Sequence, residues 1–558
     1  MKKEFIKNNI HIFLSLVIGA VIFILIYGPD ILNPTYIDWM FLTPAHDVPQ
    51  HQIGWEFFRN TPWLFPFGIF NTLSYPVYTS VIDFDSIPIF AIIFKIFSDI
   101  LPQNFQYLGL WGIICYMLQC LFGTIISKKF TNNKLLALLG GILFTLMPIL
   151  SLRMYIHTAL ATHWLLLLCM MPIVYDKELS FKYKLYIYTV AGILTAGIQV
   201  YLIAICGIIV LVHTLYCVFA NKQVKSMLFS ILYSLSSIIT LWLLGIFSMN
   251  TIAATDKESL FAYSANLNTL FNPSFVGRAY PELKIIEFPL ESFGYLGCGI
   301  LSLLFISLFL YFINKRKNIN TIEKINKNFY IQCFILIGIS MILACSPQIT
   351  FNNKILFTVP YPDFIINIWS VLRSTGRFIF ITDYVILTVI IAYLFKNTKV
   401  RTVVFLLIVS IVIQVYDLFD HYKGNYCKKS PDITYINAFN KDIYKNIFIN
   451  VKVIYPVFDV LEYQLFIYDI AQYAYEHNMK LGNFYSSRDI EDYDERLEEK
   501  IKKPQDDELY IIPKDNIGEF FEKEQNLKYF YLTDNFIYAK TTPAEGLEEY
   551  TYDIKKER

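Results

Sequence analysis

Long apolar runs fill the first three quarters of the chain and predict a helical domain that spans a membrane. Eleven runs approach the length that an α-helix needs to cross a bilayer, about 20 residues. The predicted spans are residues 10–28, 105–127, 135–152, 158–175, 185–199, 200–220, 227–248, 292–313, 329–345, 378–395 and 401–418. Gly197-Ile198-Gln199 offers a turn between the fifth and sixth. The first run lacks a small-residue cleavage site, so we interpret it as an uncleaved anchor.

The pattern changes after residue 418, where polar and apolar positions mix over short stretches. Strands are predicted at 451–457, 510–513, 529–533 and 536–540, and helices at 465–478 and 489–503. Asp534-Asn535 is typical of a hairpin turn between the last two strands. The expected fold is therefore an α-helical polytopic membrane domain of about 11 transmembrane helices, residues 1–418, followed by a soluble α/β domain, residues 419–558. This tail contains no phosphate loop or nucleophile elbow, which favours a recognition or lid role.

Composition supports this division of the 558-residue chain. Hydrophobic residues make up 55% and charged residues only 17%, too few charges for the surface of a soluble protein of this length. The last 141 residues nevertheless hold 27 acidic and 19 basic residues. The net charge of +1 gives no support for nucleic-acid binding. Nine cysteines without a C-x-x-C pair indicate neither a disulfide framework nor a zinc site.

The distribution of charge predicts the orientation in the membrane. The six segments that would face the cytoplasm are all net positive and sum to +15, whereas loop 29–104 carries −5. The N-terminus is therefore expected inside, and the C-terminal domain outside. The large outer loops would be 29–104, 249–291 and 346–377. This asymmetry favours a protein that works outside the membrane over a symmetrical transporter.

The first outer loop carries the most informative residues. Asp47, followed by Pro49 and Gln50, predicts a helix start that places Asp47, His51 and Trp55 on one face. Either Asp47 only caps a surface helix, or it is a carboxylate beside a histidine and a tryptophan in a concave site. A carboxylate there can accept the proton of a sugar hydroxyl.

Two further acids, Asp83 and Asp85, follow in the same loop and lead into residues 89–101, which predict a helix lying in the membrane interface. Asp85 either caps that helix or belongs to the site. With Asp47 and His51 these acids offer ligands for a divalent cation, although no resident cofactor is expected.

Polar groups near the outer ends of other spans are candidates for substrate binding. Arg153 is either an interface anchor or a phosphate ligand, with His157 beside it, and Tyr201 lies at the turn between two spans. Arg373 and Arg377 lie on the outer side against the positive-inside rule, and at i, i+4 they would clamp a phosphate. The alternative is pairing with Asp363, Asp383 or lipid headgroups. On the acceptor side we noted Asp256, Asn266, Asn268 and Arg278.

The chain resembles the GT-C superfamily of membrane glycosyltransferases in the order of its elements. One span is followed by an acidic outer loop with Asp at a helix start, then by an interfacial helix and many spans. Residues 50–59, Pro62-Trp63 and 85–88 resemble more closely a bacterial family of multi-spanning proteins placed beside that superfamily, and 483–488 extend the likeness loosely into the tail. The resemblance implies an enzyme of the bacterial cytoplasmic membrane. It would move a sugar from a polyprenyl-phosphate donor to an outer-face glycan, lipid or protein acceptor, with inversion. Asp47 would be the base and Asp85 the second acid, although His46 stands where the family has a paired acid.

Two other functions remain open on the sequence. A flippase or transporter of lipid-linked sugars would need ionisable residues within the spans and internal repeats, and no clear repeat is present. A polymerase or ligase of surface glycans would share the outer-face chemistry and differ in its acceptor.

Overall fold

The computed structural model describes residues 2–42, 47–248, 251–252, 257–317, 327–427, 434–486, 489–490, 493–516 and 526–550. The chain forms two compact units. Unit 1 comprises Met1–Pro34, Tyr107–Thr240 and Thr255–Lys428, and unit 2 comprises Thr35–Gln106, Leu241–Ala254 and Lys429–Arg558. Unit 2 thus joins most of the first outer loop to the C-terminal tail, two parts that the sequence pattern treats separately.

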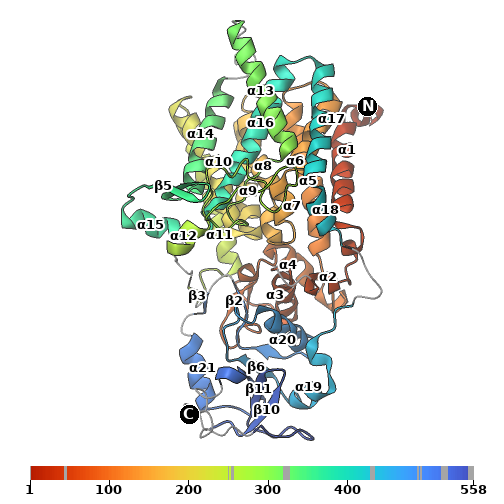
Figure 1. Cartoon of the computed structure of the whole chain (residues 1–558), viewed down its shortest axis with the longest axis vertical. Coiled ribbons are helices and arrows are strands. Elements are labelled where there is room, and N and C mark those ends of the chain that lie inside the picture. The colour runs from red at the N-terminus through yellow and green to blue at the C-terminus, as the bar shows by residue number, and fades with distance from the viewer. Residues whose placement is uncertain are drawn as a thin grey trace. The chain divides into compact units, whose positions relative to one another are not determined.

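Unit 1 is a bundle of long helices (Figure 1). In chain order these are α1 (Lys2–Tyr27), α5 (Leu108–Lys128), α6 (Lys134–Thr145), α7 (Pro148–Arg153), α8 (Trp164–Val174), α9 (Phe181–Ile198), α10 (Val200–Phe219), α11 (Met227–Leu244), α13 (Cys298–Arg316), α14 (Lys327–Ala344), α16 (Ile379–Asn397) and α17 (Val400–Asp417). Within the described residues, eight have the length and apolar composition to cross a membrane: α1, α5, α10, α11, α13, α14, α16 and α17. The predicted helical character is confirmed, and the count of eleven spans stays a prediction.

One predicted span is broken by a proline. Residues 135–152 form two helices, because α6 ends at Thr145 and α7 begins at Pro148. Proline has no amide hydrogen to donate to the preceding turn, so it starts a helix more readily than it continues one. The break leaves α7 only 6 residues long, with Arg153 as its last residue.

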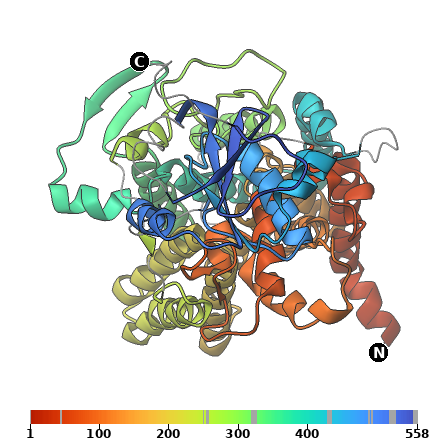
Figure 2. The same ribbon diagram turned by 90° about the horizontal axis from the view of Figure 1, so that it is seen from below.

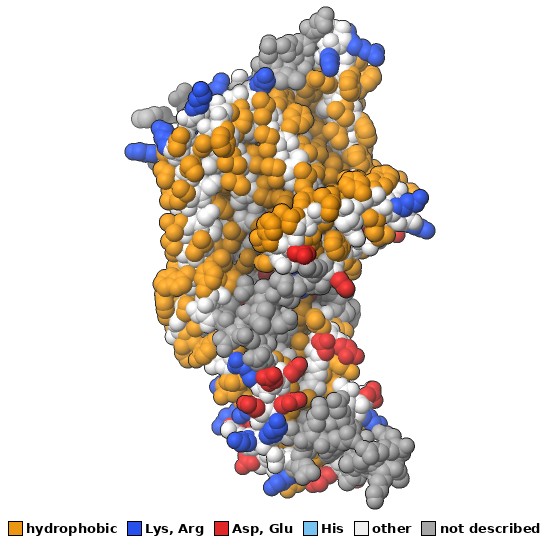
Figure 3. Space-filling view, turned by 90° about the vertical axis from the view of Figure 1, so that its left-hand side faces the viewer, with side chains coloured by type: hydrophobic (Ala, Val, Ile, Leu, Met, Phe, Trp, Pro, Cys, Tyr) orange, Lys and Arg blue, Asp and Glu red, His pale blue; other side chains and the backbone are white. Residues whose placement is uncertain are grey.

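The outward side chains of unit 1 are largely apolar. Large apolar side chains are widely exposed, for example Leu25 at 71%, Phe309 at 66% and Phe334 at 67%. Figure 3 shows them covering the helices, with Lys and Arg side chains gathered toward one end of the bundle. Contiguous apolar surface of this extent is unfavourable in water and favourable in hydrocarbon.

A short hairpin of unit 1 continues this apolar surface. Strands β4 (Gln348–Phe351) and β5 (Lys354–Thr358) pair antiparallel, and helix α15 (Asp363–Ser370) follows them. Ile355, Leu356 and Phe357 are consecutive and all more than half exposed. Consecutive residues of a strand point to opposite faces, so both faces of this strand are apolar and open.

Unit 2 contains a five-stranded mixed sheet in the order β10-β11-β9-β6-β7, seen from below in Figure 2. The strands are β6 (Val453–Pro456), β7 (Lys480–Leu481), β9 (Glu508–Pro513), β10 (Tyr529–Thr533) and β11 (Phe536–Lys540). The predicted hairpin is confirmed: β10 and β11 pair antiparallel around Asp534 and Asn535, whose φ angles of 49° and 66° fit a tight hairpin turn. The other predicted strands form β6 and β9.

Helices of the tail flank this sheet. They are α19 (Asp442–Ile447), α20 (Gln464–Glu476) and α21 (Tyr493–Lys502). The ring of Phe466 on α20 stacks on Phe536 of β11, with 3.8 Å between centroids. The predicted helix at 489–503 is shorter than expected, because Asp489–Ile490 forms strand β8, which pairs with β3 (Thr251–Ile252).

The first outer loop contributes its own elements to unit 2. These are α2 (Asp38–Phe41), α3 (Val48–Asn60), β1 (Ile69–Phe70), β2 (Thr79–Ser80) and α4 (Pro88–Lys95). The predicted interfacial helix at 89–101 is wrong in its length, because α4 ends at Lys95 and a separate 3-10 turn follows at Ser98–Ile100. Lys95 is buried, with Nζ 3.9 Å from the Phe58 ring centroid. Burial lowers the pKa of this lysine to about 8.

Gly54 of α3 provides a test of how tightly this part of unit 2 packs. A β-carbon at Gly54 would lie 2.4 Å from Cβ of Phe84 and 2.6 Å from Oγ of Ser86. We therefore expect Gly54→Ala to destabilise the fold by about 1–3 kcal/mol through overpacking. The measurement is the midpoint of thermal unfolding of the purified protein in detergent.

Gly338 of α14 is the matched control, because a β-carbon there meets no atom within 4 Å. Alanine favours a helix over glycine by about 1 kcal/mol, so Gly338→Ala should leave the midpoint unchanged or raise it. Equal losses in both variants would contradict the tight packing at Gly54.

Candidate functional site

Three charged side chains of unit 1 meet in one place, and we call Arg153, Glu291 and Arg377 the Glu291 cluster. Arg153 ends α7, Glu291 lies in the loop before α13, and Arg377 lies in the 3-10 helix η6 (Thr375–Phe378) before α16. Arg153 donates from Nη1 to Oε1 at 3.1 Å and from Nη2 to Oε2 at 3.2 Å. Arg377 donates from Nε to Oε2 at 2.7 Å and from Nη2 to Oε1 at 3.0 Å. One carboxylate therefore receives two bidentate guanidinium groups.

The cluster is enclosed and carries an excess of positive charge. The side chains of Arg153, Glu291 and Arg377 are 0%, 6% and 9% exposed. Burial alone would raise the pKa of Glu291, but the charges of Arg153 and Arg377 hold this pKa well below its usual value. Glu291 is thus ionised, and two guanidinium charges face one carboxylate charge. Nε of Arg153 is buried and has no hydrogen-bond partner among the described residues.

His157 and Tyr201 contact the arginines of the cluster. Nδ1 of His157 lies 3.0 Å from Nη1 of Arg153, and its Nε2 lies 3.8 Å from Oε1 of Glu291. The guanidinium carbon of Arg377 lies 4.3 Å from the ring centroid of Tyr201, a cation–π contact. The Tyr201 hydroxyl also accepts from the amide of Ser374 at 3.3 Å. Four sequence-predicted residues are therefore neighbours in space.

Arg373 differs from its expected geometry. It lies in an irregular segment between α15 and η6, so Arg373 and Arg377 do not share the face of one helix. The sequence left open that these arginines pair with Asp363, Asp383 or lipid headgroups, and the carboxylate that Arg377 contacts in the structure is Glu291. Sequence reasoning missed Glu291 altogether. A signal was present: arginines near the ends of predicted spans need an acidic partner, and loop 249–291 offers acidic residues.

Asp383, one turn into α16, is a separate feature of the bundle. Its side chain is fully buried, and neither carboxylate oxygen has a hydrogen-bond partner among the described residues. An ionisable residue in such a position on a candidate span is costly and usually functional.

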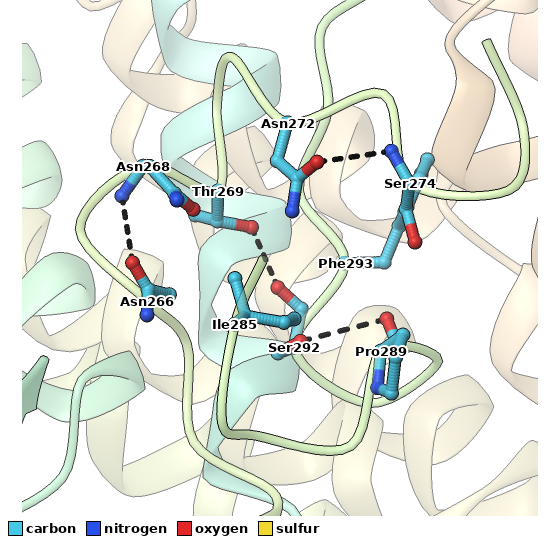
Figure 4. Close-up of a pocket in the computed structure, with 9 residues that line it drawn as sticks. All are labelled: Asn266, Asn268, Thr269, Asn272, Ser274, Ile285, Pro289, Ser292 and Phe293. Carbon is cyan, nitrogen blue, oxygen red and sulfur yellow. Dashed lines mark hydrogen bonds between the residues drawn. The ribbon is translucent and has the colours of Figure 1, made fainter. Parts of the chain in front are cut away.

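Residues of the segment 266–293, which contains Glu291, line a small polar pocket (Figure 4). The pocket is lined by Asn266, Asn268, Thr269, Asn272, Ser274, Ile285, Pro289, Ser292 and Phe293. The Asn268 side chain donates to Asn352 at 2.6 Å, while its carbonyl oxygen has no hydrogen-bond partner among the described residues. Two residues that the sequence assigned to the acceptor side, Asn266 and Asn268, are thus in the lining. Asp256 lies outside the described residues, as do His46 and residues 487–488 of the quoted likeness.

In unit 2, helix α3 starts where the sequence predicts, directly after Asp47, with Pro49 in its first turn. The Asp47 side chain makes no capping hydrogen bond to the helix, and Gln50 donates instead to the carbonyl of Tyr485 at 3.1 Å. Asp47 is half-buried, and its charge acts on Tyr468 of α20. The capping role that the sequence offered as the alternative for Asp47 is therefore not observed.

The rest of α3 is buried, unlike the helix of an open site. His51 and Trp55 are both 0% exposed. Nε1 of Trp55 donates to the carbonyl of Phe105 at 3.1 Å, whereas neither ring nitrogen of His51 has a hydrogen-bond partner in the part of the chain that the structure describes. Burial lowers the pKa of His51 to about 3 and raises the pKa of Glu56 to about 8. Both groups are therefore neutral at pH 7.

Glu56 and Arg59, three residues apart on α3, make hydrogen bonds to different groups. Glu56 accepts from the Gln52 side chain at 2.9 Å, and Arg59 donates to four backbone carbonyls, those of Pro102, Gln103, Ser98 and Leu101. These carbonyls follow α4, so Arg59 holds the end of the first outer loop against α3.

Asp83 and Asp85 have different local roles. Asp83 is 2% exposed, and its Oδ2 accepts from the amide of Ser80 at 3.1 Å as one half of a capping box. Asp85 does not cap α4, whose preceding residue is Ile87. It takes a left-handed conformation with φ 50° at the end of the turn Val81–Phe84. Within the described residues, Asp47, His51, Asp83 and Asp85 include no set of three ligand atoms close enough to share a metal ion.

His51 should make the stability of the protein acid-sensitive. Its folded pKa of about 3 lies below the ordinary value of 6.5, so between these values the unfolded chain binds the extra proton. Stability is therefore expected to fall as pH decreases from 6.5 toward 3, by about 1.4 kcal/mol per pH unit for this group. Thermal unfolding at a series of pH values measures the slope, and His51→Leu should reduce it.

The exposed His477 gives the control for this measurement. His477→Gln should retain the acid sensitivity of the parent protein. If His51→Leu also retained it, the buried neutral state of His51 would be wrong.

The Glu291 cluster leads to a second stability prediction. Glu291→Gln leaves two buried guanidinium groups without their carboxylate, so we expect a loss of about 3–5 kcal/mol at pH 7. The folded pKa of Glu291 is depressed, so its contribution is present above the ordinary value of 4.5 and is lost as pH falls below it. The difference in unfolding midpoint between parent and variant should accordingly shrink below pH 4.5. A difference that does not change with pH would argue against an ionised Glu291.

Comparisons with known proteins identify a family and a distant structural likeness. No curated protein matches this sequence. Among solved structures, the chain is similar to the crystal structure of the Archaeoglobus fulgidus oligosaccharyltransferase in the apo form, with 11% sequence identity and a TM-score of 0.39. That likeness covers 97% of this chain and 75% of the other. A family model described as a domain of unknown function (DUF6311) matches residues 16–419, well over half of the chain, and the protein belongs to that family.

Proposed function

We propose that this protein is a membrane glycosyltransferase of GT-C type that moves a sugar from a polyprenyl-phosphate donor to an acceptor on the outer face of the membrane. The observation that carries the proposal is the Glu291 cluster, in which two buried arginines share one carboxylate. Its excess positive charge suits a phosphate group, and guanidinium groups bind phosphate bidentately. Nε of Arg153, which is buried without a partner, is a donor that such a group would satisfy.

The donor phosphate would be bound by Arg153 and Arg377, with Arg373 from the adjoining segment. Binding would loosen one guanidinium from Glu291, because each arginine already uses two donors on that carboxylate. His157 and Tyr201 would keep these arginines oriented through the contacts at Arg153 Nη1 and the Arg377 guanidinium.

Asp47 would act as the general base. In the transfer, Asp47 accepts the proton of the acceptor hydroxyl, whose oxygen forms a bond to the anomeric carbon. The bond between that carbon and the phosphate oxygen breaks, and the lipid phosphate leaves with the electron pair, giving inversion. Asp85 would be the second acid. Asp83 has a structural role through its capping box, and His51 and Trp55 are too deeply buried to meet a sugar.

The proposal includes a topology and a location. The N-terminus and the basic connections would face the cytoplasm of a bacterium, and loop 29–104 and the C-terminal domain would face outward. The acceptor would be a glycan, a lipid or a protein. The amide-rich pocket at Asn266 and Asn268 has hydrogen-bonding groups suited to sugar hydroxyls. Neither a cofactor nor a resident metal takes part in this reaction scheme.

Transport of a lipid-linked sugar is the second candidate, and Asp383 is the observation that favours it. A buried carboxylate without a partner on a candidate span is typical of ion-coupled transporters. Asp383→Asn should abolish a transport activity, whereas the glycosyltransferase proposal assigns no chemistry to this residue.

The catalytic assignment is tested with Asp47→Asn and Asp85→Asn in reconstituted membranes supplied with a radiolabelled polyprenyl-phosphate sugar. Removing a general base is expected to lower the rate of transfer about 10²–10⁴-fold. Asparagine tolerates the left-handed conformation of residue 85, so a loss in Asp85→Asn would report the charge and not the backbone.

The exposed Asp99 of the same loop provides the control, and Asp99→Asn should transfer at the parent rate. Full activity in both Asp47→Asn and Asp85→Asn would refute the base assignment. Arg377→Lys keeps the charge and loses the bidentate fork, so it should raise KM for the donor more than it lowers kcat.

A further inference from the structure

A second cluster of unit 1, separate from the Glu291 cluster, combines three different metal-ligand types. Asp176 follows α8, and His213 and Cys217 lie one turn apart on α10. The candidate ligand atoms, a carboxylate oxygen, an imidazole nitrogen and the thiol sulfur, all lie within 4.8 Å of one another. His213 and Cys217 are buried, and Asp176 is partly exposed. The i, i+4 spacing puts both α10 ligands on one face of the helix.

The state of His213 is the independent observation that points to a ligand. The side chain is 0% exposed, and Nε2 has no hydrogen-bond partner among the described residues. This nitrogen lies 3.7 Å from Oδ1 of Asp176, too far for a hydrogen bond. A buried imidazole nitrogen that lies near a carboxylate without a hydrogen bond to it is unfavourable, and a cation between the two would remove that cost.

The other ring nitrogen is already fixed in the manner of a metal ligand. Nδ1 of His213 lies 2.6 Å from the hydroxyl of Tyr188, and the ring stacks on Phe229 with 5.6 Å between centroids. A histidine that binds metal through one nitrogen usually donates the other N–H to a neighbouring acceptor, which sets the tautomer and the orientation of the ring. Tyr188 is placed for that role, and it leaves the Nε2 lone pair free for a metal.

Lys184 currently balances the charge of Asp176. Its ammonium group forms an ion pair with Oδ1 of Asp176 and donates to the Asp176 backbone carbonyl at 2.7 Å. A divalent cation held by one thiolate and one carboxylate is electrically neutral, so Lys184 would keep its carbonyl contact and release the carboxylate. Metal binding and the lysine ion pair therefore compete for the same oxygen.

We propose that Asp176, His213 and Cys217 form a binding site for a divalent transition metal of the zinc class. Imidazole and thiolate ligands favour Zn²⁺ and its neighbours over Mg²⁺ and Ca²⁺, which prefer oxygen. Three protein ligands leave one coordination position for water or another small ligand. The bound ion would join the α8–α9 connection to α10. This site is independent of the proposed glycosyl transfer and of its residues.

Cobalt(II) gives a direct test, because a cysteine thiolate bound to Co²⁺ produces a near-ultraviolet charge-transfer band. The full chain, purified in detergent and freed of metal with a chelator, is titrated with Co²⁺ and then with Zn²⁺. We expect one equivalent of Co²⁺ to give the thiolate band together with the visible absorption of a tetrahedral ion, and Zn²⁺ to remove both. Cys217→Ser should lack the band.

Two variants separate this site from incidental metal binding. Tyr188→Phe removes only the hydroxyl beside Nδ1 and should weaken Co²⁺ binding about 10–100-fold. Cys120→Ser alters another buried cysteine and should titrate like the parent. Absence of the band in the parent protein, or its persistence in Cys217→Ser, would overturn the proposal. Size-exclusion profiles and unfolding midpoints in the absence of metal confirm that each variant is folded.

Discussion

The cost of burying a charge is the constraint on which the described structure depends. Unit 1 has few charged side chains in its interior, and Arg153 is fully buried among apolar helices. It can remain charged there because Glu291 supplies a carboxylate within hydrogen-bond distance of two of its nitrogens. Arg377 uses the same carboxylate, which ties the start of α16 to the end of α7. The loop before α13 therefore joins two distant helices through a single side chain.

Unit 2 buries some ionisable groups in their neutral form, whereas the Glu291 cluster of unit 1 buries them as ion pairs. Helix α3 buries His51 and Glu56 with no ion pair to either among the described residues, and burial shifts the pKa of each in the direction that favours its neutral form. A neutral imidazole and a neutral carboxyl group cost much less to bury than their charged forms. Lys95 shows a third arrangement, because its buried ammonium group lies over aromatic rings, those of Phe58 and Trp63. The two units thus show three ways of keeping an ionisable group away from water.

Local patterns in the sequence predicted local structure well. The hairpin at Asp534-Asn535, the helix that begins after Asp47 and the long apolar helices all follow from signals within a few turns of chain. The failures concern partners that are distant in sequence. Glu291 is 138 residues from Arg153 and 86 from Arg377, and no periodicity reports such a pairing. Burial of His51 and Lys95 was missed for the same reason, because it depends on what packs over the helix. The grouping of Asp176 with His213 and Cys217 is likewise not predictable from spacing, because Asp176 lies in the connection after α8 and the other two lie on α10.

The arrangement of the Glu291 cluster also bears on why it is there. Replacing a buried ion pair by well-packed apolar residues is often neutral or stabilising, so stability alone is a weak reason for such a pair. Among the described side chains of the cluster, two arginines and one glutamate carry one more positive than negative charge, in a site that is nearly closed to solvent. An anion that enters this site would balance the charge and satisfy the unpartnered Nε of Arg153. In the proposed function a donor phosphate would offset this cost, because its non-bridging oxygens can accept hydrogen bonds from the guanidinium groups of Arg153 and Arg377.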